Sequence, residues 1–205
     1  MHFETKQFNK IHGRKEERMR MSSTVDAVEH IIKKADALVR RFKTRSPVEI
    51  ARDLNIIVKY GEFTELKGLY SYMYRNRFIV LNSRLEEIEQ TITCAHELGH
   101  DQLHRHLARL GLMKDFQIYN ATGTHEYEAN LFAAQLLIAG DDFLDCAGRG
   151  YTYAQIASQL NVHEELAVLK AVILQRQGHK FNIPYVPKST YLGGKGSLPH
   201  PGIIK

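Results

Sequence analysis

The sequence predicts an α+β fold, in which a mainly helical domain contains a small antiparallel sheet and is followed by a short helical pair. Three observations support this class. Apolar residues recur at three- and four-residue spacing over much of the chain, as in amphipathic helices. Residues 56–82 are rich in β-branched and aromatic residues, as in strands. Two short helical patterns then follow each other closely within residues 152–175.

The composition is that of an ordinary globular protein. Hydrophobic residues make up 43% of the chain and charged residues 25%, which argues against a disordered protein. The net charge of +5 is too small to indicate nucleic-acid binding by itself. Cys94 and Cys146 are far apart and form no CxxC pattern, which suits a reducing compartment. No apolar run is long enough to cross a bilayer, so we expect a cytoplasmic protein without a membrane partner.

Changes in composition divide the chain into four predicted segments. Residues 1–23 are basic and lack the apolar run of a secretory signal, so we expect a loose leader. Residues 24–145 form the main domain, and residues 146–178 form a helical pair that resembles a helix-turn-helix. Residues 179–205 are rich in proline and glycine, which predicts an irregular tail.

Two helices are expected at the start of the main domain. Apolar residues recur at helical spacing over residues 24–42. Ser46 is placed as the N-cap of the next helix, because Pro47 suits its first position and Glu49 completes a capping box. Asn55 is expected to end this helix.

Short strands are expected next. The stretch "IIVKY" (56–60) reads as one strand, because it is rich in β-branched and aromatic residues. The stretch "GLYSYMYRNRFIVLN" (68–82) reads as a hairpin with its turn near Arg75 and Asn76. Together they predict a small antiparallel sheet. Helical spacing then resumes over residues 85–107 and 125–138.

The first of these later helices carries the HExxH pattern formed by His96, Glu97 and His100. Residues four apart lie on the same face of a helix, so both imidazoles can reach one metal ion. Zn2+ suits the pattern because it accepts nitrogen ligands and leaves a position open for water. Glu97 can then act as the general base that takes a proton from this water. The alternative is a solvated helix face with scattered histidines, which the strong apolar periodicity disfavours.

Two histidines compete for the third ligand position. His106 stands ten residues after His96, the offset used in the longer HExxHxxGxxH pattern. That pattern needs a glycine where this chain has Leu103, so the helix is expected to continue and to point His106 elsewhere. His104 lies one turn beyond His100 on the ligand face, too far along the helix axis to share the ion easily, and is expected to line the site or touch the substrate.

A carboxylate from the next helix is the other candidate. Glu126 or Glu128 would complete a His2Glu site if this helix packs against the first. Asn130 lies one turn after Glu126 and could orient a ligand by a hydrogen bond. Without the HExxH partner, both acids would be read as solvated residues at a helix N-terminus. Spacing alone does not separate Glu126 from Glu128.

The HExxH helix, the small sheet before it and the motif "ExEANxFAAxLL" about thirty residues later resemble the ImmA/IrrE family of metallo-endopeptidases. The resemblance covers roughly residues 30–140 and implies a zincin-like metallopeptidase domain over residues 24–145 with bound Zn2+. It also implies that the metal ligand is the first glutamate of this motif, Glu126. Where family members often end this helix with Leu-Met-Pro, the chain reads "LLIAGDD" (136–142), which leaves the end of the helix open.

The resemblance implies an intracellular zinc endopeptidase, typical of phages and mobile elements, that cleaves a helix-turn-helix repressor. The alternative is an inactive protease-like regulator that binds a repressor or DNA without cutting. An inactive regulator could have lost any of the expected site residues, but all four are present: His96, Glu97, His100 and Glu126. The absence of a secretion signal and of disulfides disfavours a general digestive protease.

The helical pair within residues 146–178 is not expected to read DNA directly. A DNA reader needs base-contacting polar side chains at the start of its second helix. Here that start is His163-Glu164-Glu165, whose acids would face phosphates. A structural role or the docking of a protein partner, such as the repressor, is therefore the preferred interpretation.

Overall fold

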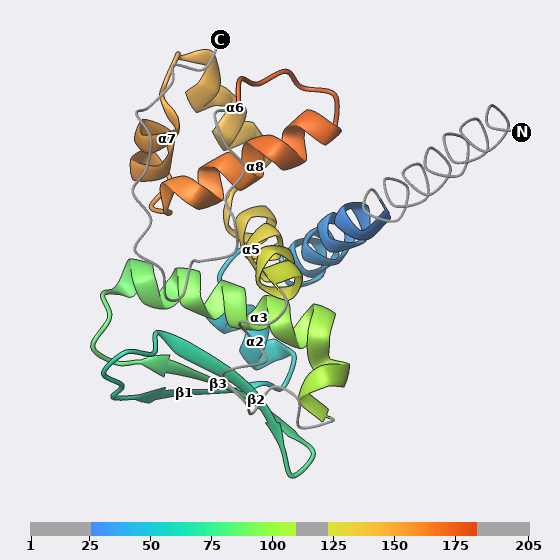
Figure 1. Ribbon diagram of the computed structural model, residues 1–205, viewed down its shortest axis with the longest axis vertical. Helices are drawn as coiled ribbons and strands as arrows, with labels where there is room; N and C mark the ends of the chain where they lie inside the picture. The colour runs from blue at the N-terminus through green and yellow to red at the C-terminus, as the bar shows by residue number, and fades with distance from the viewer. Residues whose placement is uncertain (1–25, 110–122, 184–205) are drawn as a thin grey trace, which may run out of the picture.

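The computed structural model describes residues 26–109 and 123–183 of the chain. The predicted leader (1–23) and most of the predicted tail (184–205) lie outside the described residues. The described part combines several helices with one small sheet, which confirms the predicted α+β class (Figure 1).

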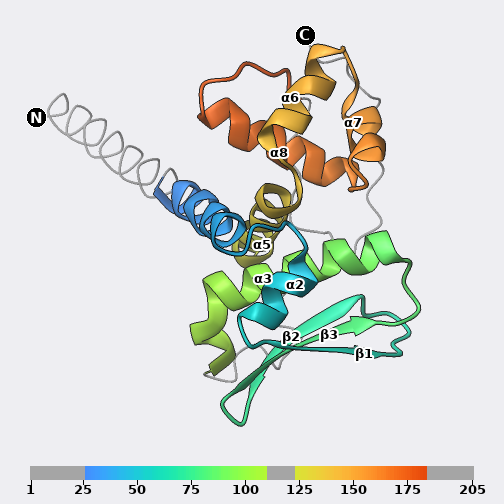
Figure 2. The ribbon, with the colours of Figure 1, turned by 180° about the vertical axis from the view of Figure 1, so that it is seen from behind.

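The described elements follow one another in this order: a helix over residues 26–42, α2 (Pro47–Asp53), β1 (Ile57–Gly61), β2 (Gly68–Met73), β3 (Asn76–Asn82), α3 (Glu87–Arg109), α5 (Gly123–Leu137), α6 (Gly140–Gly148), α7 (Tyr153–Gln159) and α8 (Glu164–Arg176). The long helix α3 runs through the middle of the molecule. The sheet lies on one side of it, and α5 crosses its other side (Figures 1 and 2).

The sheet is mixed, so the prediction of an antiparallel sheet is wrong for one strand. Its strand order is β1-β3-β2, with β3 antiparallel to β2 but parallel to β1. Residues 62–67 carry the chain from β1 past the position of β3 to the far edge. The tight turn then brings β3 back between its neighbours, in the same direction as β1. Sequence patterns reveal the hairpin, but not the edge at which an earlier strand joins it.

The hairpin turn consists of Tyr74 and Arg75, one residue earlier than predicted. Both residues have positive φ, 50° and 63°, as in the two-residue turns that match the twist of a hairpin. Asn76 is instead the first residue of β3. In the strand order β1-β3-β2, β2 is an edge strand, and it contacts α3.

A buried carboxylate fastens the hairpin to α3 next to the HExxH pattern. Asp101 follows His100 and is fully buried. It accepts hydrogen bonds from the Tyr70 hydroxyl at 2.8 Å, from Arg77 at 3.1 Å and from Arg105 at 2.8 Å. Such charge-assisted bonds compensate the burial of the carboxylate and hold the sheet against the helix.

Helices α3 and α5 approach closely at Gly99. A Cβ atom on Gly99 would lie 3.1 Å from Ala129 Cα and 3.2 Å from Ala129 O. The next turn of α5 presents two further buried alanines, Ala133 and Ala134. Small residues on both helices therefore let the backbones meet where α5 crosses α3 (Figure 1).

The C-terminal helices belong to the same hydrophobic core. Helix α6 was not predicted and begins where the motif "LLIAGDD" left the helix end open. The predicted pair is present as α7 and α8, and α7 has the full capping box of Thr152 and Gln155. Helix α8 packs against α5, and most side chains of α8 are buried. None of the helices in the described ranges has the length and apolar character needed to span a bilayer.

Candidate metal centre

The two histidines of the HExxH pattern lie one turn apart on α3, on the face that meets α5. Both side chains are buried, and their Nε2 atoms are 3.0 Å apart. Their rings are nearly perpendicular, with an interplanar angle of 79°. Helical spacing thus brings two ligand nitrogens together within a single element.

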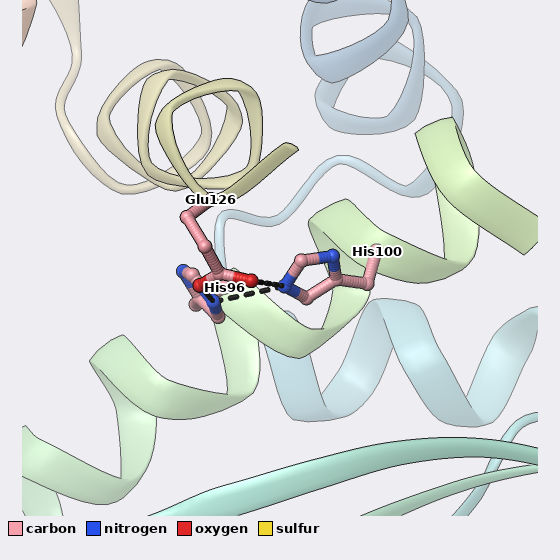
Figure 3. A group of neighbouring side chains, drawn as sticks. All are labelled: His96, His100 and Glu126. Carbon is pink, nitrogen blue, oxygen red and sulfur yellow. Dashed lines mark hydrogen bonds and ion pairs between the residues drawn. The ribbon is translucent and has the colours of Figure 1, made fainter. Parts of the chain in front are cut away.

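Glu126 reaches the same point from the first turn of α5 (Figure 3). Its Oε2 atom is 3.2 Å from His96 Nε2, and its Oε1 atom is 3.4 Å from His100 Nε2. Oε1 is buried and has no hydrogen-bond partner among the described residues. A buried carboxylate oxygen without such a partner is costly, so another partner is expected there.

The donor set fits a zinc ion. Ligand atoms of a tetrahedral zinc with bonds of about 2.0–2.1 Å lie about 3.3 Å apart. The two histidine Nε2 atoms are 3.0 Å apart, and each lies 3.2–3.4 Å from a different oxygen of Glu126. Two nitrogens and one carboxylate are also the donors of known catalytic zinc sites, which keep a fourth position open. The residues present could therefore hold the ion that the sequence predicts.

The electrostatics of His100 and Glu126 suit metal binding. Burial, together with the neighbouring His96, lowers the pKa of His100 to about 4, although Glu126 opposes this change. His100 is therefore neutral near pH 7, as a metal ligand must be. Burial would raise the pKa of the Glu126 carboxyl, but its contacts with His100 and His96 lower it overall.

Glu97 follows His96 on α3 and is only 3% exposed. Burial raises the pKa of its carboxyl to about 7, against the opposing effect of His96. A hydrogen bond from the backbone of Tyr70, on the edge strand β2, lowers the pKa of this carboxyl and so opposes the effect of burial. At Gly68, at the start of β2, a Cβ atom would lie 3.4 Å from Glu97 Cγ. Glu97 is thus held between α3 and the edge of the sheet.

Asn130 lies one turn after Glu126 and contacts His96. Its Oδ1 atom is 2.7 Å from His96 Nδ1 and accepts the hydrogen bond from this nitrogen. A proton on Nδ1 leaves the Nε2 lone pair free for a metal ion. The geometry therefore suits the orienting role predicted for Asn130.

The remaining histidines of the segment supply no ligand atom to this group. His106 is exposed. His104 is buried one turn beyond His100, and its Nε2 atom is 2.9 Å from Glu128 Oε2. With His125 these two residues form a second group of close donor atoms that the sequence analysis missed. The regular four-residue spacing from His96 to His104 was the available signal for it.

The sequence is similar to a known protein family and to a phage protein. The family model described as the IrrE N-terminal-like domain, Peptidase M78, matches residues 51–172, which include α3, α5 and the start of α8. A relative from Bacillus phage phi105, named "Uncharacterized immunity region protein 2", is 37% identical over 134 residues, covering 65% of this chain and 84% of that protein.

The fold, the site and these matches together define a protein of the metallopeptidase type. The chain belongs to the Peptidase M78 family, whose model describes the IrrE N-terminal-like domain. The resemblance to the ImmA/IrrE family inferred from the sequence is thereby confirmed. This membership supports a metal cofactor, in agreement with the grouped His and Glu side chains.

Proposed function

We propose that the chain is an intracellular zinc-dependent endopeptidase that hydrolyses a peptide bond in a helix-turn-helix transcriptional repressor. The observation that carries the proposal is the convergence of three buried donors, His96, His100 and Glu126, at separations of 3.0–3.4 Å. Membership of a peptidase family supports the reaction class.

Each residue of the centre has a distinct part in the proposed reaction. His96, His100 and Glu126 hold a zinc ion, which when bound acts as a Lewis acid toward the peptide carbonyl and the attacking water. Glu97 takes a proton from this water at its carboxylate and delivers it to the amine that leaves. Asn130 accepts the Nδ1 proton of His96 and so fixes the orientation of that ring.

The proposed substrate rests on the resemblance and on the phage relative. The ImmA/IrrE family resemblance implies cleavage of a repressor, and the name of the phi105 protein places that protein in an immunity region. Direct DNA binding is disfavoured, because α8 begins with Glu164 and Glu165 and buries most of its remaining surface in the core. A repressor bound as a protein partner is therefore the preferred interpretation.

The test is to co-express the chain with a helix-turn-helix repressor encoded beside its gene and to read intact masses. Wild-type chain should yield two repressor fragments whose masses sum to the repressor plus one water. Glu97→Gln should retain about one zinc per chain but lower the cleavage rate by at least about 100-fold, because the proton acceptor is lost. Glu87→Gln, an exposed acid on the same helix, is the matched control and should cleave normally.

An intact repressor beside zinc-loaded wild-type chain would contradict the endopeptidase proposal. If the repressor then copurified with the chain uncut, the protein would be the inactive regulator considered as the alternative. Cleavage that continued at the wild-type rate in Glu97→Gln would instead remove Glu97 from the proposed role.

A further inference from the structure

A continuous line of polar contacts runs from the candidate metal centre toward α5. His100 Nδ1 is 3.0 Å from His104 Nδ1, and His104 Nε2 is 2.9 Å from Glu128 Oε2. His104 is only 3% exposed, and Glu128 is partly buried. The contacts therefore lie in a sheltered environment, where the position of each proton matters.

Binding of a metal ion by His100 would fix the protons along this line. If His100 binds through Nε2, its proton must be on Nδ1. This Nδ1 donates to His104, so His104 Nδ1 must be unprotonated and must accept. The proton of neutral His104 then lies on Nε2, which donates to Glu128. A single arrangement of protons thus satisfies both contacts.

We propose that His104 and Glu128 form a relay that fixes the ring orientation and the tautomer of His100 and thereby strengthens its bond to the metal. This inference deepens the proposed function and rests on the metal centre assigned there. His104 and Glu128 are positioning residues, because they act on the metal only through His100.

Glu128 completes the relay. Its Oε2 atom lies 2.9 Å from His104 Nε2 and accepts the hydrogen bond from this nitrogen. A carboxylate that accepts from an imidazole increases the basicity of the other ring nitrogen. That nitrogen of His104 faces His100. His96 differs, because its partner is the neutral amide oxygen of Asn130.

The same residues also suggest a second metal site, but the proton positions oppose it. Ligand atoms of His104, His125 and Glu128 all lie within 4.8 Å of one another. A metal bound to His104 Nε2 would require the His104 proton on Nδ1. This proton would face the Nδ1 proton of metal-bound His100 across 3.0 Å, so two donors would oppose each other. The relay therefore predicts one zinc per chain, not two.

Zinc affinity without any substrate is the direct test. The purified full-length chain is titrated with zinc against a chromophoric chelator. His104→Ala and Glu128→Gln should weaken binding by about 10- to 100-fold, the usual effect of removing a partner of a metal-bound histidine. His104→Gln, which can still accept from His100, should recover part of the loss. His106→Ala, an exposed histidine on the same helix, should match the wild type.

Nitrogen-15 NMR of histidine-labelled, zinc-loaded chain supplies a readout that a merely structural role would not change. His104 should carry its proton on Nε2, and Glu128→Gln should alter its Nε2 signal while His96 stays as in the wild type. Unchanged zinc affinity in both His104→Ala and Glu128→Gln would overturn the relay. So would two zinc ions per chain with one lost in His125→Ala, because this result requires the second site.

The two proposals fail in different ways. If wild-type chain binds no zinc, the proposed metal centre is wrong and the relay falls with it. If wild-type chain binds one zinc tightly but both relay variants bind it equally well, only the relay is wrong. Cleavage of the repressor plays no part in either comparison.

Discussion

At the scale of single residues, Glu126 is the one proposed ligand that comes from outside the HExxH pattern. Its two oxygens lie 3.2 and 3.4 Å from the two histidine nitrogens. Glu126→Gln should weaken zinc binding by at least about 100-fold, because a neutral amide is a poor ligand for the ion. Elemental analysis after dialysis would measure the loss. Glu164→Gln, also in the first turn of its helix, should keep its zinc.

The sequence alone identifies some of the proposed ligands but not all of them, for a physical reason. The one-turn spacing of His96 and His100 is a local property of α3, so it can be recognised without knowledge of the fold. The choice between Glu126 and Glu128 depends on how α5 crosses α3. In the structure Glu126 faces His96 and His100, whereas Glu128 faces His104. Only the family resemblance favoured Glu126 beforehand.

At the scale of secondary-structure elements, the crossing of α3 and α5 decides whether the proposed ligands meet. Gly99→Ala should gain up to about 1 kcal/mol of helix propensity. Its Cβ would press on the Ala129 backbone, which can yield only if α5 moves. We therefore expect a net loss of about 1–2 kcal/mol in the free energy of unfolding. Zinc binding should weaken as well, because Glu126 moves with α5.

Urea denaturation and zinc titration would measure both effects. Gly148→Ala is the matched control, because its Cβ would meet no atom within 4 Å. This variant should be as stable as the wild type or slightly more stable. Equal stability and equal zinc affinity in Gly99→Ala would mean that the two helices have room to separate.

The elements themselves were predictable to different degrees. Helix α3 and the β2–β3 hairpin have strong local signals, namely helical periodicity and a strand-turn-strand pattern. The parallel pairing of β1 with β3 has none, because it depends on which edge of the hairpin is free. Helix α6 begins at Gly140 and has no side-chain hydrogen bond at its N-cap, Ala139, so its start lacks the usual sequence signal.

At the scale of the whole molecule, a buried polar chain joins three helices that are far apart in sequence. Gln135 of α5 donates to Asp36 at 2.6 Å and accepts from Lys170 of α8 at 2.7 Å. Lys170 is only 2% exposed. A charged group buried this deeply needs its partner, so the network ties α8 to α5 and to the N-terminal helix.

Lys170 should make stability depend on pH. Burial lowers its pKa to about 8 in the folded protein, whereas the unfolded chain has a pKa of about 10.4. Between these values the unfolded state binds more protons, so this residue makes the free energy of unfolding rise with pH. Lys170→Met should lack this contribution, which amounts to at most about 3 kcal/mol.

Urea unfolding of wild type and variant from pH 7 to pH 10.5 would measure this contribution. The comparison must be between the two proteins, because burial raises the pKa of Cys94 and of Tyr70, which act in the opposite direction in this range. Lys180→Met removes an exposed lysine and is the control. A parallel pH dependence in wild type and Lys170→Met would show that Lys170 is solvated in the folded protein.

The packing of α8 on α5 has a consequence for the synthesis of the protein. Both histidines of the proposed centre are made early, but the helix that supplies Glu126 is covered only when residues 164–176 have been added. Ribosomes add about 5–20 residues per second, so roughly 4 to 15 s separate His100 from the end of α8. During this interval a nascent chain lacks the support that holds its third proposed ligand. Zinc binding at the proposed centre would therefore begin only after residues 164–176 have been translated.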